Sequence, residues 1–310
     1  MSGPGELDLP RGIALAWGIA ADPQRGPKRE MSVERIVEAA VEIADSEGLA
    51  AVSMAAVASR LGYTPMSLYR YVSAKDDLVL LMQEEATGLP PASILEPDTW
   101  RGRLELLYRE FVTNYLRHPW VLDVPINGSP TTPNSAAWMD VGLSALGATP
   151  LSYDERLSVV LLITGHAYWT GRVIAGYTRV QRETGQETGD IARREDALYR
   201  ELVTADAYPQ LRAAIDAGVF LDESDPFAFA VARSLDGIAA YIGSLEQGAA
   251  HEEGQMWPAA PDAELAADKK LREAQRGVRD AERALRDARR HERQTAREAA
   301  ERLRRTRSDL

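Results

Sequence analysis

Residues 53–75 read SMAAVASRLGYTPMSLYRYVSAK and predict two short helices joined by a tight turn. Ser53 is a preferred N-cap residue, because its hydroxyl can accept a hydrogen bond from an N–H of the first turn. The apolar residues that follow it repeat with helical spacing: Met54, Val57, Ala58 and Leu61. Gly62 allows the chain to turn at positive φ, and Thr64 followed by Pro65 begins a second helix. The two helices are therefore about four residues apart, which is the spacing of a helix-turn-helix.

The second helix has one face suited to reading DNA. Leu68 and Val72 are one turn apart and are expected to point into the protein. The other side carries Met66, Ser67, Arg70 and Tyr71. Arginine can bind guanine through two parallel hydrogen bonds, hydroxyl groups reach phosphates or base edges, and apolar side chains contact the thymine methyl group. This outward set is the candidate reading face, and a purely structural pair of helices is the alternative.

The residues after the second helix predict a further helix with a phosphate contact at its start. Ser73 is expected to cap this helix, and Lys75 falls in its first turn. A cation there opposes the helix dipole, so it needs an external partner such as a DNA phosphate. The alternative is a solvated surface lysine.

Two amphipathic helices flank the motif. Ser32 begins the first and Gly48 ends it, and its apolar face consists of Val33, Ile36, Val37, Ala40, Val41 and Ala44. The second spans residues 76–86 and buries Leu78, Leu81 and Met82. Together these segments predict a small three-helix domain that continues into a longer fourth helix.

Residues 35–82, RIVEAAVEIADSEGLAAVSMAAVASRLGYTPMSLYRYVSAKDDLVLLM, resemble the tetracycline-repressor (TetR) family of bacterial transcription regulators. Just before them, RGPKREMS at residues 25–32 resembles the basic arm of actinobacterial members. The resemblance implies an all-helical homodimer that places two recognition helices in a near-palindromic operator, and a larger C-terminal domain that dimerises and holds a small-molecule inducer. Carried over by position, it implies DNA contacts from Ser53, Thr64, Ser67, Tyr69, Arg70, Tyr71 and Lys75. Ala55 and Ala56 depart from the family, since many relatives have a polar contact there, so this protein is expected to depend more on its second helix.

Composition indicates a cytoplasmic protein whose attraction to DNA is local. A length of 310 residues favours about two domains, and the absence of cysteine excludes disulfides and thiolate metal sites. The net charge is −11, so any electrostatic attraction to DNA must come from a local patch. Arg25, Lys28 and Arg29 provide one on a Gly/Pro-containing arm that could enter a minor groove. A solubilising linker is the alternative interpretation of these three residues.

The N-terminal residues do not predict a membrane segment. The apolar run at residues 13–21 is too short to span a bilayer, and the acidic residues before it do not suit a secretory signal. Leu15, Trp17 and Ile19 are instead expected to pack on the body of the protein. No membrane partner is expected.

The chain divides into four regions: an N-terminal extension and basic arm (1–30), the helix-turn-helix domain (31–88), a ligand-binding and dimerisation domain (89–248) and a charged helical tail (249–310). The third region is expected to contain helices at 100–117, 135–146, 153–175, 191–204 and 227–245. A proline-containing connector at 90–97 precedes them, and loops at 127–134 and 178–190 lie between them. The apolar segments 157–174 and 227–245 are expected to pair across a twofold axis as a four-helix interface. An ordinary intramolecular core is the alternative.

A ligand pocket needs an apolar lining with a few polar groups. The candidates with this mixture are Phe111, Tyr115, Trp138, Met139, His166, Trp169 and Arg172. His166 alone could be a satisfied core histidine. Tetracycline is not the expected ligand, because Pro125 and Ile174 fall near the positions of the family's magnesium–drug site. No metal or other cofactor is expected, and the inducer is expected to be apolar or aromatic.

The tail repeats large and small apolar residues every seven positions. Leu271, Val278 and Leu285 recur, and Ala274, Ala281 and Ala288 follow each by three. Residues 262–310 contain 15 Lys/Arg and 11 Asp/Glu. Four interpretations of this tail are open: a solvated helix, a second dimer contact, docking on the acidic body of the protein, or an extra contact with DNA.

The chain shows no catalytic motif of the common types, GxSxG, HExxH or GxGxxG, and no catalytic residue is expected. The favoured function is a DNA-binding regulator, in particular a repressor that binds a palindromic operator as a homodimer and is released by a small molecule. The alternative is a non-enzymatic interaction factor, or an activator, that acts through the tail without an inducer.

Overall fold

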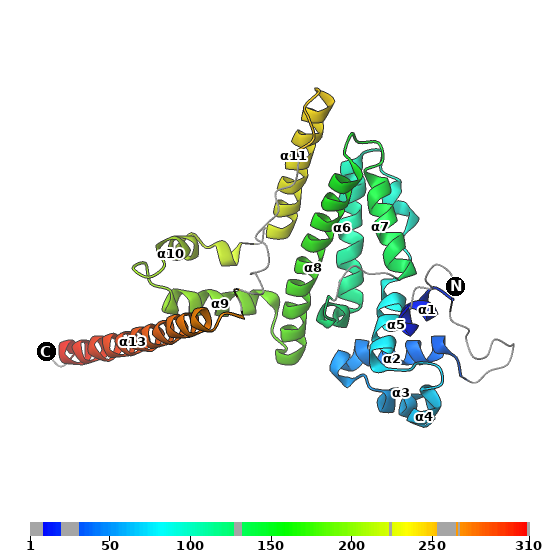
Figure 1. Cartoon of the computed structure of the whole chain (residues 1–310). Helices are drawn as coiled ribbons and strands as arrows, with labels where there is room; N and C mark the ends of the chain where they lie inside the picture. Colours follow the sequence, from blue (N-terminus) through cyan, green and yellow to red (C-terminus); the bar gives the residue numbers. More distant parts are fainter. Residues whose placement is uncertain are drawn as a thin grey trace. The chain divides into compact units, whose positions relative to one another are not determined.

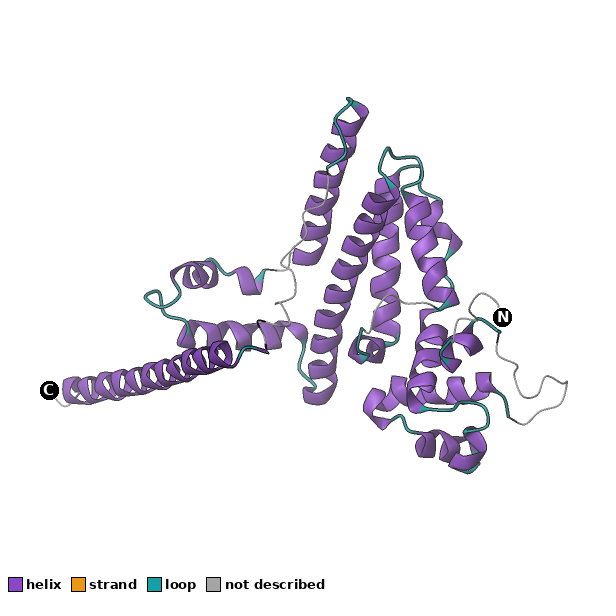
Figure 2. Ribbon diagram, in the orientation of Figure 1, coloured by secondary structure: helices purple, strands orange, loops and turns teal. Residues whose placement is uncertain are grey.

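The computed structural model describes residues 9–19, 31–126, 132–222, 225–252, 265 and 267–308, and the regular elements among them are all helical (Figures 1 and 2). The chain divides into two compact units, Met1–Ala250 and His251–Leu310. The predicted all-α fold is confirmed in the described residues. The basic arm residues Arg25 and Lys28 lie outside them.

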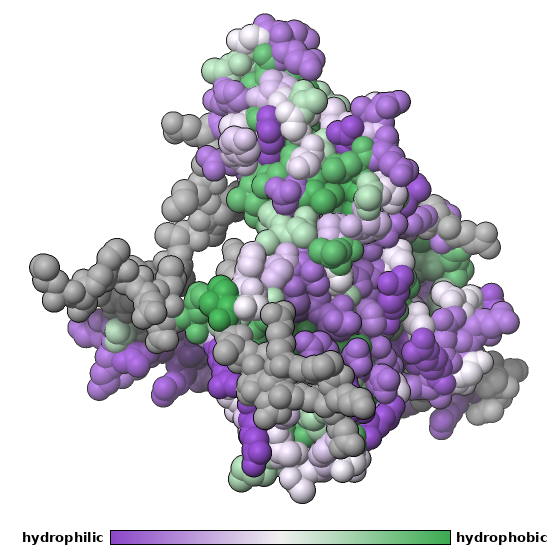
Figure 3. Space-filling model, turned by 90° about the vertical axis from the view of Figure 1, so that its right-hand side faces the viewer, coloured by the Kyte–Doolittle hydropathy of each residue, from purple (hydrophilic) through white to green (hydrophobic). Residues whose placement is uncertain are grey.

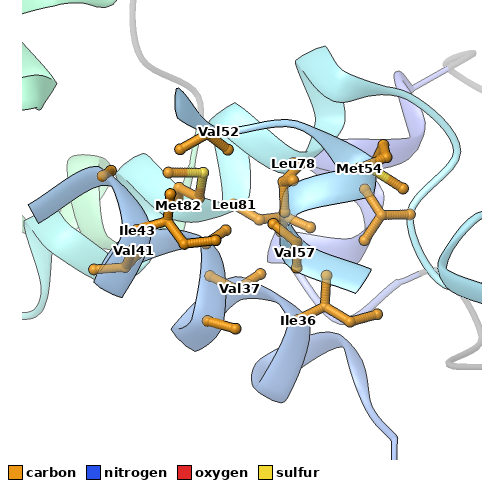
Figure 4. Close-up of a cluster of buried hydrophobic side chains, with 14 of the residues drawn as sticks. Ile36, Val37, Val41, Ile43, Val52, Met54, Val57, Leu78, Leu81 and Met82 are labelled. Carbon is orange, nitrogen blue, oxygen red and sulfur yellow. The ribbon is translucent and has the colours of Figure 1, made fainter. Parts of the chain in front are cut away.

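The DNA-binding domain is built from α2 (Val33–Glu47), α3 (Met54–Leu61), α4 (Pro65–Leu68) and α5 (Lys75–Thr87), with a short 3₁₀ turn, η1 (Leu49–Ala51), between α2 and α3. The hydroxyl of Ser32 accepts the Arg35 N–H at 3.3 Å, and Gly48 ends α2 at φ +86°, as the sequence predicts. Apolar side chains of α2, α3 and α5 point toward one another in a common core (Figure 4). This core fixes the angle at which α3 and α4 are presented.

An N-terminal helix, α1 (Arg11–Ala16), packs against α5. Leu15 is partly buried against the core of the DNA-binding domain, as predicted. Ile19 is 67% exposed, so the prediction that it also packs on the body is wrong, whereas Trp17 is 49% exposed and therefore about half buried. The chain turns directly after α1, at Gly18, where φ is +65°.

The larger helical domain begins immediately after Gly88. It contains η2 (Ala92–Leu95), α6 (Trp100–Arg117), η3 (Pro119–Asp123), α7 (Pro133–Ala145), α8 (Tyr153–Thr184) and α11 (Pro226–Glu246). The proline-rich connector is more than a linker, because Ile94 in η2 is fully buried in the core of this domain. The centre of the domain is the contact between α6 and α8 (Figure 1). The helices approach closely where Gly171 faces Tyr115, since a Cβ at residue 171 would lie 2.9 Å from the Tyr115 Cβ.

The region predicted as a loop at 178–190 is mostly helical. α8 continues to Thr184, and only Gly185 to Glu187 separate it from α9 (Thr188–Leu202). The helix is extended by contacts that the local sequence does not reveal, such as the Tyr177 hydroxyl donating to Glu195 at 2.8 Å. α10 (Pro209–Asp216) and η4 (Val219–Leu221) complete this part, and the rings of Tyr199 and Phe220 stack with centroids 4.8 Å apart.

The second unit contains α13 (Lys269–Ser308), a helix of 40 residues. Asp268 caps it by accepting the Leu271 N–H at 2.7 Å. Val278 and Leu285, from the predicted seven-residue repeat, are 57% and 51% exposed. The tail is therefore helical as predicted, with an exposed apolar stripe.

Candidate nucleic-acid interface

The helix-turn-helix is held by the local bonds that its sequence predicts, with one exception. The Ser53 hydroxyl accepts the Ala56 N–H at 3.1 Å, and Gly62 ends α3 in the left-handed region at φ +77°. Thr64 occupies the N-cap of α4, but its side chain makes no capping bond. Its carbonyl oxygen instead accepts the Ser67 hydroxyl at 2.6 Å. The turn between α3 and α4 is thus short and rigidly defined.

The predicted Ser73 cap is wrong. Ala74 is the N-cap of α5 and forms no side-chain bond there. Lys75 is the first helical residue, and the carboxylates of Asp76 and Asp77 follow in the first turn. Negative charge at this position interacts favourably with the helix dipole, so these acids stabilise the helix start without a capping hydroxyl. Lys75 is exposed, which leaves its ammonium group accessible.

The reading face differs in part from the predicted outward set. Leu68 and Val72 are fully buried, as predicted, and Met66 is 75% exposed. Regular α-helix ends at Leu68, and the chain then turns so that the Val72 N–H donates to the Leu68 carbonyl at 3.0 Å. In this turn Tyr71 is partly buried against the core, whereas Tyr69 is 48% exposed.

Among the predicted DNA contacts of residues 64–75, Thr64, Met66, Tyr69, Arg70 and Lys75 are exposed, whereas Ser67 is partly buried and bonded to the turn.

A short element links the DNA-binding domain to the larger domain. We call η3 together with His118 the η3 bridge. On one side, the Asp45 carboxylate of α2 accepts the Trp120 indole N–H at 2.7 Å and lies 2.8 Å from the His118 Nδ1. Trp120 is only 2% exposed and belongs to the core of the DNA-binding domain. The residues that follow the predicted helix end at His118 thus place Trp120 in the core of the DNA-binding domain.

The other side of the η3 bridge contacts α8. The carbonyl oxygen of Leu122 accepts the Tyr168 hydroxyl at 3.0 Å and the Arg172 guanidinium at 2.7 Å. Arg172 also lies 3.6 Å from the Asp123 carboxylate. These bonds connect this part of α8 to η3, and Trp120 connects η3 to α2.

A second connection joins α5 to α6 and α7. The carbonyl oxygen of Thr87 accepts the Asn114 amide at 2.9 Å, and that of Gly88 accepts the Trp138 indole N–H at 2.9 Å. The Glu84 carboxylate accepts the Asn134 backbone N–H at 2.7 Å near the start of α7. The C-terminal end of α5 is thus fixed to the helices that carry the candidate ligand residues.

The candidate ligand-binding residues fall into two groups. Phe111, Tyr115 and Trp138 form an aromatic cluster, with ring centroids 6.2 Å apart for Phe111 and Tyr115 and 4.4 Å for Phe111 and Trp138. The cluster continues to Tyr168, whose ring centroid is 6.0 Å from that of Tyr115. Burial raises the pKa of Tyr115 to about 12, so this phenol keeps its proton to a higher pH than an exposed tyrosine does. Met139 packs on the same core.

The other three candidates make contacts of their own, and Arg172 shares the Leu122 carbonyl with Tyr168 of the cluster. The His166 Nε2 lies 3.4 Å from the Ser234 hydroxyl of α11. Trp169 is 58% exposed, and Arg172 contacts the η3 bridge. The sequence places His166 and Trp169 within one turn, but the structure gives them different surroundings.

Several residues in these contacts were not predicted from the sequence, among them Asp45, Trp120 and Tyr168. A large aromatic residue directly after a predicted helix end was the one available signal for Trp120.

Comparison with known proteins identifies both domains. Residues 36–82 match the model described as bacterial regulatory proteins, tetR family, and residues 93–242 match that of the tetracyclin repressor-like C-terminal domain. The HTH-type transcriptional repressor DrrR1 of Streptomyces coeruleorubidus is 33% identical over 240 residues, covering 77% of this chain and 88% of DrrR1. An HTH-type transcriptional regulator of Saccharopolyspora erythraea is 30% identical over 166 residues, covering 54% of this chain and 70% of that protein.

Solved structures show the same fold. Apo ActR from Streptomyces coelicolor superposes with a TM-score of 0.54 at 23% identity, covering 71% of this chain and all of ActR. ActR in complex with actinorhodin gives the same TM-score at 22% identity, covering 69% of this chain and 96% of ActR. The charged helical tail lies beyond the residues matched by the family models. With both domain models matched and DrrR1 similar over most of its length, the chain belongs to the TetR family and is a DNA-binding transcription regulator.

Proposed function

We propose that this protein is a homodimeric repressor that acts in the cytoplasm, binds a near-palindromic operator and is released from it by an apolar, aromatic small molecule. The observation that supports it best is the η3 bridge, which connects the aromatic cluster to the domain that carries the exposed reading face. The name of DrrR1 describes a repressor, which supports repression over activation here.

Exposed apolar side chains on α8 and α11 support a homodimer. Leu161 is 55% exposed, Trp169 58% and Phe229 68%. Figure 3 shows one face of the molecule, on which apolar side chains lie at the surface among polar ones. Contiguous exposed apolar surface marks an interaction site, and a twofold axis lets one such surface cover its own copy. The exposure of these residues favours the four-helix interface over an ordinary intramolecular core.

A membrane would be another environment for α8. Its length and composition would allow it to cross a bilayer, but core helices of water-soluble proteins satisfy the same criteria. In one helical turn of α8, Ala167 and Thr170 are buried in the protein whereas Trp169 is exposed. A helix with one buried and one exposed apolar face suits packing against a second subunit.

The aromatic cluster supports a planar or polycyclic ligand. Aromatic rings recognise flat apolar molecules, and nearby hydroxyl groups orient them. ActR, which has the same fold, has been solved in complex with actinorhodin, which supports a ligand-binding role for this domain. Ligand entry between α6 and α8 would move Tyr168, and therefore the carbonyl of Leu122 to which it donates. Release from DNA then requires that the ligand bind the altered arrangement more tightly than the DNA-bound one.

Three measurements test this proposal. Selection from random DNA fragments gives the operator, and sedimentation equilibrium gives the subunit number. A screen of aromatic metabolites and antibiotics against the protein–DNA complex then identifies the ligand.

Matched variants test the dimer. Leu161→Asp is expected to yield monomers, whereas Leu198→Asp, on exposed α9, should leave the dimer intact. A wild-type monomer that binds operator with full affinity would contradict the proposed assembly.

The second candidate is a factor that acts through its tail. The exposed stripe of α13 supports it, because Val278 and Leu285 present apolar surface along a long helix. A chain that ends at Gly248 distinguishes the two. Retention of operator binding and ligand release supports the ligand-released repressor, and loss of regulation with intact DNA binding supports the tail-dependent factor.

A further inference from the structure

The N-terminal helix α1 is bonded directly to the first turn of α5. The backbone N–H of Gly12 donates to the Asp77 carboxylate at 3.0 Å. A Cβ at residue 12 would lie 2.9 Å from that carboxylate oxygen and 3.2 Å from the Asp77 Cα. A larger residue would therefore force the Asp77 carboxylate away from the Gly12 N–H and crowd the backbone of α5. Leu15 and Ala16 complete the docking by packing against the core of the DNA-binding domain.

This docking places Arg11 beside Arg70, in the turn that follows α4. Its guanidinium Nη2 lies 3.5 Å from the carbonyl oxygen of Arg70. That distance is at the long limit of a hydrogen bond, and no other bond from this exposed side chain to a described residue is present, so most of its five N–H donors can bind another partner. Lys75 is two residues before Asp77 and is exposed as well. Arg11 thus lies beside the turn that carries Arg70 and leads from α4 to Lys75 at the start of α5.

Positive charge is scarce in this domain, which makes the location of Arg11 significant. Residues 31–88 contain nine acidic side chains and only four basic ones. Of these four, Arg60 already pairs with Glu42 at 3.2 Å. Affinity for DNA depends strongly on cations that neutralise phosphates. An additional arginine held next to Arg70 and Lys75 is therefore a substantial part of the local positive charge.

We propose that α1 is a DNA-binding element, in which Arg11 binds a backbone phosphate next to the one contacted by Lys75. The Gly12–Asp77 contact positions it. The proposal rests on the DNA-binding activity of the family and is independent of ligand release and of the operator sequence.

The test measures the salt dependence of binding by Arg11→Ala, using a fluorescent DNA duplex of mixed sequence. Loss of one phosphate contact lowers the slope of log K against log salt by about 0.9 per protomer. Arg11→Lys retains the charge and should keep the wild-type slope. Arg193→Ala removes a charge from exposed α9 and should also leave the slope unchanged.

A second variant tests the docking itself. Gly12→Val keeps Arg11 but introduces a side chain where Asp77 lies, so it should lower the slope as much as Arg11→Ala. Its helix content and the melting of the larger domain should match the wild type, because only α1 is displaced. A wild-type slope in Arg11→Ala would overturn the proposal. An equal loss in Arg11→Lys and Arg11→Ala would also overturn it, because it would assign Arg11 to bracing the Arg70 carbonyl.

Discussion

Asp45 should couple the DNA-binding domain to the larger helical domain. Its replacement should therefore change both the free energy of unfolding and the release of operator by the ligand. Asp45→Ala takes away the acceptor of the Trp120 indole N–H, which is in a side chain only 2% exposed. A buried donor that loses a charged acceptor costs about 1.5–3 kcal/mol. The Asp45 side chain is itself 34% exposed, so water can partly replace it, and the expected loss is about 1–2 kcal/mol. Asp45→Asn retains an oxygen acceptor and should lose less.

Urea unfolding measures this free energy, and the same helix provides a control. Glu42→Ala removes an ion pair with Arg60 in which the two side chains are 64% and 46% exposed. Exposed pairs contribute at most about 1 kcal/mol and often much less. The regulatory readout is release of operator by the ligand, which should weaken in Asp45→Ala more than operator affinity does. Equal unfolding free energies for Asp45→Ala and Glu42→Ala would refute the structural role of this contact, and unchanged ligand release would refute the coupling.

Three further outcomes are expected. Arg70→Ala should relax base preference at a cost of about 1–3 kcal/mol in operator affinity, whereas Lys75→Ala should weaken binding to all DNA sequences alike, as measured by competition binding. Unchanged operator affinity in folded Arg70→Ala would exclude Arg70 as a base contact. A chain ending at Gly248 should remain a dimer in sedimentation equilibrium, and monomers would show that the tail holds the subunits together. Because the pKa of Tyr115 is raised from 10.0 to about 12, the folded state keeps the phenol proton to a higher pH than the unfolded state, and the contribution of Tyr115 to stability falls as pH rises from 10 through 12. The free energy of unfolding of Tyr115→Phe should therefore fall less over this pH range than that of the wild type. An identical fall would contradict the burial of this phenol.

Local chemistry explains which parts of the fold the sequence predicted correctly. Ser32, Gly48, Ser53 and Gly62 each act through bonds or backbone angles within a few residues, and the structure confirms all four. These positions are sufficient to define the helix-turn-helix, because its spacing is a property of one short segment. The Ser73 cap failed for the same kind of reason, since two neighbouring carboxylates stabilise the helix start instead.

Contacts between distant segments explain what the sequence did not predict. The Asp45–Trp120 bond joins residues 75 positions apart, and helix periodicity carries no information about such a pair. The extension of α8 to Thr184 likewise depends on Tyr177 reaching Glu195 on the next helix. Among the candidate ligand residues, spacing grouped His166 with Trp169, but neighbouring helices gave them different environments. The DNA contacts and ligand contacts assigned to individual residues stay predictions.

Footprinting on DNA fragments selected from a random pool tests the central claim most directly. Cleavage by hydroxyl radicals, with wild-type protein and with Arg70→Ala, maps the protected backbone at single-nucleotide level. Two recognition helices related by a twofold axis should protect two equivalent half-sites about one helical turn apart, 10–10.5 base pairs from centre to centre. Arg70→Ala should lose this pattern on the selected fragments while retaining weak, sequence-independent binding. A single asymmetric protected patch, or a selected pool with no shared sequence, would contradict a dimeric regulator that reads its operator through α4.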